Sequence, residues 1–94
     1  MDEIKLKKYA ELLEVEIKKN LGNSSDVDWL DQYPTLVEAI SDAKAGRVNQ
    51  PRDLGLTRWI FESDIQSFDI LTERLMQFET LLRGLDLKSE NISR

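Results

Sequence analysis

The sequence predicts an all-α fold, a small single-domain bundle of three main helices with the second broken near Pro34. Three observations support this prediction. Apolar residues recur at steps of three and four over long stretches, which is typical of amphipathic helices. All four glycines and both prolines fall where such a stretch could end. No alternating run indicates a strand, so residues 1–94 are expected to form one helical domain.

The first helix is expected over residues 2–21. Its apolar stripe recurs at steps of four and three and consists of Leu6, Ala10, Leu13, Ile17 and Leu21. Acidic residues stand at its start, whereas Lys18 and Lys19 stand at its end, an arrangement that suits the helix dipole. Gly22 follows as a natural stop, because glycine readily adopts the left-handed conformation that ends helices.

The second helical stretch is interrupted by Pro34. Ser25 is expected to cap a short helix over 26–32, with Asp28 completing a capping box. The residue before a proline is pushed out of the helical region, and the proline itself suits the first turn of a new helix. The new helix is expected over 34–45, either as the second half of a kinked helix or as a separate one. Its expected core-facing residues are Leu36, Val37, Ile40 and Ala43.

The last third of the chain has the clearest pattern, an apolar seam at alternating steps of three and four: Phe68, Leu71, Leu75, Phe78, Leu82 and Leu85. It predicts one long C-terminal helix over 57–84, roughly 42 Å in length. Phe61 and Ile65 extend the stripe, and Ser63-Asp64 marks a bend where the spacing shifts. Residues 46–56 are expected to be a connection, with a helical turn at Pro51 as one option, and residues 86–94 are expected to fray.

Two uses of this seam remain open at the level of sequence. It packs against the other helices of the same chain, as any bundle requires, or it forms a homodimer interface. The residues of that interface would be Phe68, Leu71, Leu75, Phe78 and Leu82.

The composition excludes several classes of chemistry. The chain has no Cys and no His, so it lacks disulfides, thiolate metal sites, cysteine nucleophiles and the commonest general base. Asp26 and Asp28 match the first two ligand positions of an EF-hand loop, but Leu30, Asp31 and Val37 break that pattern. We therefore expect no enzymatic activity, no catalytic residues, no cofactor and no metal site.

Charge and hydropathy bear on partners and location. The net charge is −5, which argues against binding to nucleic acids or anionic membranes, because both need a positive field. The N-terminus does not resemble a secretory signal peptide, and no apolar run approaches the length of a membrane span. A cytoplasmic protein with no membrane association is expected.

The negative charge is concentrated between residues 20 and 43, which contain five acidic residues and no Lys or Arg. The predicted partner-binding face lies in this segment and combines acidic and aromatic residues: Asp26, Asp28, Trp29, Asp31 and Tyr33. Aromatic residues are enriched at interface hot spots, and an acidic surround favours a basic protein partner. The competing interpretation is a solvated capping region with Trp29 in the core.

The function expected from these features is a non-enzymatic protein–protein interaction module. Small helical immunity proteins, antidotes, inhibitors and secretion chaperones of bacteria share this outline, which is a fold-level association. The alternative is a homodimeric structural or scaffold protein whose connection binds an anion or, secondarily, nucleic acid. The residues for that alternative are Arg47, Arg52 and Arg58, because guanidinium groups suit phosphate and carboxylate.

Overall fold

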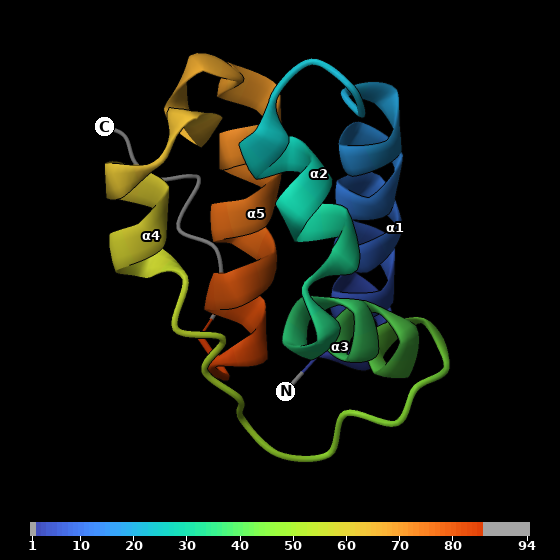
Figure 1. Ribbon diagram of the computed structural model, residues 1–94. Coiled ribbons are helices and arrows are strands. Elements are labelled where there is room, and N and C mark those ends of the chain that lie inside the picture. Colours follow the sequence, from blue (N-terminus) through green and yellow to red (C-terminus); the bar gives the residue numbers. More distant parts are fainter. Residues whose placement is uncertain (1, 86–94) are drawn as a thin grey trace, which may run out of the picture.

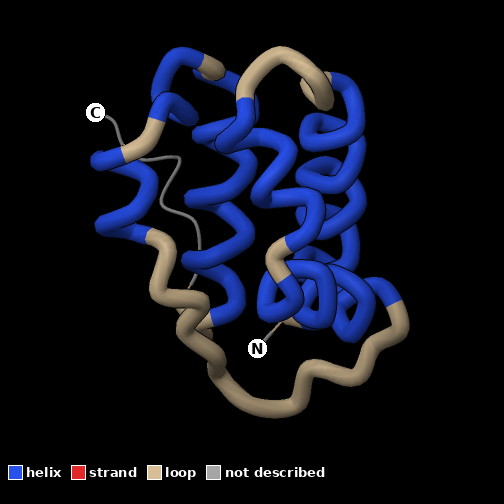
Figure 2. The backbone as a smooth tube through the Cα atoms, viewed as in Figure 1, coloured by secondary structure: helices blue, strands red, loops and turns tan. Residues whose placement is uncertain are grey.

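The computed structural model describes residues 2–85 and is all-α, with no strand among these residues (Figures 1 and 2). This confirms the predicted fold class. The elements in chain order are α1 (Glu3–Lys19), α2 (Ser25–Gln32), α3 (Pro34–Lys44), α4 (Thr57–Glu62), the 3₁₀ helix η1 (Asp64–Ser67) and α5 (Asp69–Leu82). The expected frayed tail, residues 86–94, lies outside the described residues.

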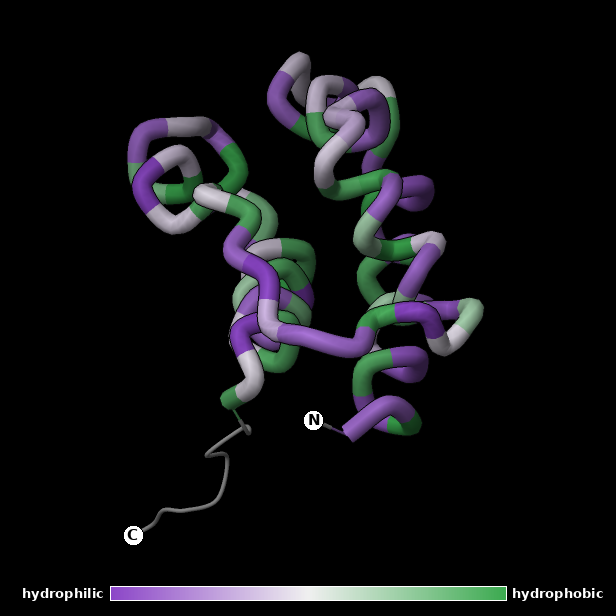
Figure 3. The backbone as a smooth tube through the Cα atoms, turned by 90° about the horizontal axis from the view of Figure 1, so that it is seen from below, coloured by the Kyte–Doolittle hydropathy of each residue, from purple (hydrophilic) through white to green (hydrophobic). Residues whose placement is uncertain are grey.

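The core lies between α1, α5 and α3, because α1 makes its most extensive contacts with these two helices. The buried residues of α1 are those of the predicted stripe without Leu21: Leu6, Ala10, Leu13 and Ile17. Figure 3 shows hydrophobic and hydrophilic segments alternating along the helices, as expected when each helix turns one face inward. Burial of these side chains is the main stabilising term of the bundle.

The apolar seam of the C-terminal third packs inside the single chain. Leu71, Leu75, Phe78 and Leu82 are fully buried, and Phe68 is partly buried against them. Leu85 lies beyond the end of α5 and is exposed, so its assignment to the seam is wrong. A homodimer through the seam stays a prediction, and it would require these side chains to leave the core of their own chain.

The first helix is two residues shorter at its C-terminal end than the sequence predicts. Asp2 caps α1 at its start, and its carboxylate accepts hydrogen bonds from the backbone N–H groups of Ile4 and Lys5. The helix ends at Lys19, with Asn20 as its C-terminal cap. Leu21 therefore leaves the apolar stripe and is exposed.

Pro34 separates two helices rather than kinking one. Tyr33 is extended, with φ −73° and ψ 109°, and Pro34 starts α3 as predicted. The cap of α2 is Ser24, whose hydroxyl accepts a hydrogen bond from the N–H of Asp26 at 3.1 Å, so the expected cap at Ser25 is wrong by one residue. Asp28 forms no capping box and instead accepts a hydrogen bond from the N–H of Gly22 at 2.9 Å.

Helix α3 buries three of its four expected core residues, Leu36, Ile40 and Ala43. Val37 is 47% exposed, so its placement in the core is wrong; it lines an open pocket described below. The helix ends in a Schellman motif, in which the N–H of Arg47 donates to the carbonyl of Asp42 at 2.8 Å. Gly46 makes this turn possible because its φ of 72° is costly for other residues.

The stretch expected as one helix over 57–84 is interrupted twice, first at Ser63, where the sequence predicts a bend, and again at Phe68; the long C-terminal helix is α5. Ser63 is extended, and its hydroxyl accepts a hydrogen bond from the N–H of Ile65 at 3.2 Å, which starts η1. Phe68 also leaves helical geometry, and α5 begins after it. Side chains that bond nearby backbone groups compete with the helix. Ile65 is buried as predicted, whereas Phe61 is 62% exposed.

The connection over residues 46–56 is fixed to the end of α5. The N–H of Arg52 donates to the carbonyl of Leu82 at 2.8 Å, and Val48, Leu54 and Leu56 are buried. No helical turn forms at Pro51. The connection therefore carries the chain past the end of α5 and brings α4 alongside the bundle (Figure 1).

Replacement of Leu75 by alanine is expected to destabilise the protein by about 2–5 kcal/mol, because a fully buried leucine leaves a cavity. Urea denaturation of the two proteins measures this difference. Ile70→Ala is the matched control: Ile70 lies on the same helix but is exposed, so its loss should stay within about 0.5 kcal/mol. A loss below about 1 kcal/mol for Leu75→Ala would contradict its place in the core.

Candidate functional site

Three aromatic side chains lie in contact at the surface and are here called the aromatic cluster (Trp29, Tyr33 and Trp59). The rings of Trp29 and Tyr33 are stacked with centroids 4.6 Å apart, and those of Trp29 and Trp59 are 4.7 Å apart. Trp29 is 42% exposed, so it belongs neither to the core nor to free solvent. Tyr33 also donates its hydroxyl to the carbonyl of Leu54 at 3.4 Å.

Two different parts of the chain supply the cluster. Trp29 lies in the second half of α2, and Tyr33, four residues later, is the extended residue that caps the end of this helix. Trp59 comes from α4, whose opposite side buries Ile60 in the core. Trp59 was not predicted as a site residue, because nothing in the local pattern links it to α2.

The acidic residues predicted with Trp29 and Tyr33 do not all lie beside them. Asp26 stands three residues before Trp29, and its carboxylate accepts a hydrogen bond from the N–H of Asp64 at 2.6 Å. Asp28 and Asp31 instead face α1 and the turn after it. Asp28 bonds the N–H of Gly22, and Asp31 forms an ion pair with Lys18 at 2.7 Å. Of the three predicted carboxylates, only Asp26 therefore lies on the side of α2 that carries Trp29, whereas Asp28 and Asp31 face α1 and the turn after it.

The three arginines of the predicted anion site also separate. Arg47 and Arg52 converge on the carboxylate of Asp42, each with a nitrogen–oxygen distance of 3.0 Å. Arg58 lies on α4 and pairs with Glu62, also at 3.0 Å. The hydrogen bond from Arg52 lowers the pKa of Asp42 against the opposing effect of burial, and Arg47 adds to the lowering. A carboxylate of the chain itself therefore already occupies the site expected for an anion.

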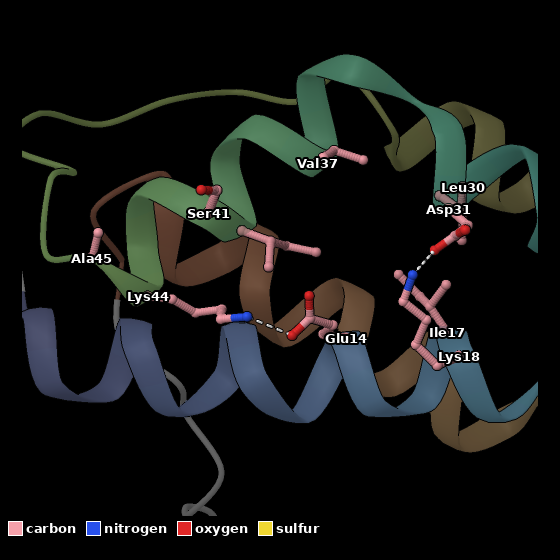
Figure 4. A pocket seen from close by; sticks show the side chains of 10 residues that line it. Glu14, Ile17, Lys18, Leu30, Asp31, Val37, Ser41, Lys44 and Ala45 are labelled. Carbon is pink, nitrogen blue, oxygen red and sulfur yellow. Dashed lines mark hydrogen bonds and ion pairs between the residues drawn. The ribbon is translucent and has the colours of Figure 1, made fainter.

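A pocket of about 380 Å³ opens between α1, α2 and α3 (Figure 4). Ile17, Leu30, Val37 and Ile40 form its apolar lining. Two ion pairs lie at its ends: Lys44 with Glu14 at 2.6 Å, and Lys18 with Asp31 at 2.7 Å. The hydrogen bond to Asp31 raises the pKa of Lys18, so this ammonium group is charged at neutral pH.

The charged side chains that line this pocket form ion pairs with one another. Each ammonium group has a carboxylate partner from another helix, and the lining carries equal numbers of both signs. No surplus charge selects an anion or a cation, and neither end of the pocket differs in sign from the other. The pocket is a second candidate site, because its size suits a small molecule. Its paired charges favour no particular ligand.

No protein-family model, curated protein or solved structure matches this chain. Among residues 2–85, no group of three or more acidic side chains is arranged to hold a metal ion. Within the same residues, every buried side-chain nitrogen or oxygen has a hydrogen-bond partner. Within the described part of the chain, no helix is both long and apolar enough to cross a membrane.

The paired carboxylate of Asp42 predicts a specific pH dependence. Its folded-state pKa lies below the ordinary value of about 3.9. Its contribution to stability is therefore complete above that value and is lost as the pH falls through the folded-state pKa. Asp42→Asn should lower the urea midpoint at pH 7, and the gap from the wild type should close in strong acid. A gap that stays constant from pH 7 to pH 2 would contradict the pairing.

Proposed function

We propose that this chain is a non-enzymatic protein-interaction module that binds a basic segment of a partner through the aromatic cluster and the carboxylates beside it. One observation carries the proposal: Trp29 is stacked on Tyr33, contacts the tilted ring of Trp59 and still exposes 42% of its surface. Large aromatic residues at the surface are typical binding hot spots. The proposal includes a cytoplasmic location and a role of the immunity, antidote, inhibitor or small-chaperone type.

The aromatic cluster suits an interface because its rings are already held in place. A free tryptophan side chain loses rotamer freedom when a partner immobilises it, at a cost of about 0.5–1.5 kcal/mol. In the aromatic cluster, Trp29 contacts the ring of Tyr33, which follows α2 directly, and that of Trp59 from α4. Much of that entropy is lost on folding rather than on binding. A rigid aromatic surface therefore binds with less penalty than a flexible one.

The charges around the aromatic cluster favour a basic partner. Asp26 stands one helical turn before Trp29, and Glu62 stands three residues after Trp59 on α4. Asp64 is bonded through its N–H to the carboxylate of Asp26 and adds a third acidic side chain nearby. Arg58, the basic residue of α4, is paired with Glu62. Arginine and lysine side chains are attracted both to such carboxylates and to aromatic faces.

The alternative of an Arg-lined anion site is less favoured. Arg47 and Arg52 share Asp42, and Arg58 pairs elsewhere, so the three do not converge on one open position. An anion would have to displace Asp42 from two guanidinium groups at once. The aromatic cluster needs no such rearrangement to meet a partner.

Trp29→Ala is expected to weaken partner binding by at least about 2 kcal/mol, roughly 30-fold, as for other aromatic hot spots. The probe is a displayed library of short peptides, which the wild-type protein should enrich for sequences with Lys or Arg. Affinity for the selected peptides is then measured for wild type, Trp29→Ala and Phe61→Ala. Phe61 is exposed on α4 but makes no ring contact with the cluster, so its replacement should change the affinity little.

Two results would reject this proposal. One is a library selection without enrichment of basic peptides. The other is equal affinity of wild type and Trp29→Ala while both remain folded by circular dichroism. Loss of folding in Trp29→Ala would instead assign Trp29 a core role, the competing interpretation of this segment.

Electrostatic attraction should speed association with the selected peptides. The association rate is expected to fall with added salt, because the Debye length shrinks from about 10 Å at 0.1 M to about 3 Å at 1 M. Asp26→Asn should reduce the association rate at low salt more than Glu11→Gln, which removes an exposed charge from α1. Stopped-flow measurements test this, and equal rates for the two variants would contradict a role of Asp26 in steering.

A further inference from the structure

A buried carboxylate holds the start of the helix that carries Trp59. Glu79 on α5 is 3% exposed and is the only charged residue buried among residues 2–85. One of its oxygens accepts a hydrogen bond from the N–H of Leu56 at 3.3 Å, and the other accepts one from the hydroxyl of Thr57 at 3.2 Å. Within the described residues, no Lys or Arg forms an ion pair with it.

This contact supplies the cap that helix α4 does not have of its own. Its N-terminal cap position is Leu56, which offers no side-chain hydrogen bond. The first N–H groups of any helix need partners, and a carboxylate is the most favourable one at that end. With six residues, α4 is also too short to be stable alone. Its main helix contact is with η1, so Glu79 attaches the start of α4 to the central helix α5.

The position of Trp59 follows from the position of α4. Trp59 stands two residues after Thr57, and its ring lies 4.7 Å from that of Trp29. We propose that Glu79 is a positioning residue for the aromatic cluster, which fixes Trp59 against Trp29 by capping α4 from α5. This inference rests on the proposed function for its biological meaning, since the partner-binding surface would be assembled only while Glu79 holds α4.

The buried position shows why a hydrogen-bond acceptor is needed there. Burying a carboxylate is costly unless its oxygens are hydrogen-bonded, and both oxygens of Glu79 are used. Methionine has nearly the same length and favours helices, but it offers no strong acceptor to Leu56 or Thr57. Glutamine keeps an oxygen for the N–H of Leu56, and its amide can donate to the hydroxyl oxygen of Thr57.

The experiment measures ring positions without any partner. Two tryptophan rings this close give an exciton couplet in circular dichroism. The variant Trp59→Phe, which has only one of these two rings, gives the spectrum without the couplet. Glu79→Met is expected to reduce the couplet to less than half of the wild-type amplitude. In the same variant, amide hydrogen exchange over residues 56–62 should become at least tenfold faster while α1 is unchanged. Glu79→Gln should restore both readouts towards the wild type.

Glu73→Met is the matched control, because Glu73 is an exposed residue of the same type on the same helix. It should leave both readouts unchanged. The proposal is overturned if Glu79→Met keeps the wild-type couplet and exchange rates, or if Glu73→Met alters them equally. It is also overturned if Glu79→Gln reduces the couplet and accelerates amide exchange as much as Glu79→Met does.

A second variant applies if Glu79→Met does not fold. Thr57→Val removes only the hydroxyl that donates to Glu79, and it should accelerate exchange over residues 56–62 by a smaller factor. If amide exchange over residues 56–62 in Thr57→Val is as slow as in the wild type, the proposal is overturned. A failure of the proposed function is distinguished by another measurement. If Trp29→Ala leaves the peptide affinity unchanged, the proposed function is rejected, whereas the couplet and the exchange rates test only the role of Glu79.

Discussion

The packing of α1 against α5 is the contact on which the rest of the fold depends. Both helices present fully buried apolar stripes, which include Leu6 and Leu13 on α1 and Leu71 and Leu75 on α5. Each fully buried leucine contributes about 1.5–3 kcal/mol, so this one interface supplies a large part of the stability of a small domain. Helix α3 also packs against α1 and adds to the same core.

The short helices α2 and α4 bury Val27, Leu30 and Ile60 in the core, and polar contacts between distant residues also fix their positions. Asp26 on α2 accepts the N–H of Asp64, and Glu79 on α5 accepts the N–H of Leu56 just before α4. Such contacts fix position more than they add stability, because a hydrogen bond contributes only about 0.5–1.5 kcal/mol net. The aromatic cluster connects these two helices, so its geometry depends both on the packing of Tyr33 and Trp59 against the core and on these directed bonds.

The sequence predicts well what depends on local periodicity and poorly what depends on distant contacts. The stripe of α1, the break at Pro34 and the buried seam of α5 follow from spacing and proline chemistry. The bend at Ser63-Asp64 also follows from the shift in spacing, whereas the second break, at Phe68, interrupts a strong apolar pattern. The ring of Trp59 and the carboxylate of Glu79 meet partners 30 and 23 positions away. No helical or strand period encodes such distances.

The acidic segment illustrates why charge alone is a weak guide to a binding face. Asp28, Asp31 and Asp42 are engaged by the chain itself, as a turn acceptor and as ion-pair partners. A partner that used them would first have to replace these contacts, with little net gain. Asp26, Glu62 and Asp64 near the aromatic cluster also have partners within the chain. On the proposed function, these carboxylates therefore act mainly on the rate of encounter, whereas the strength of the complex depends on the aromatic surface.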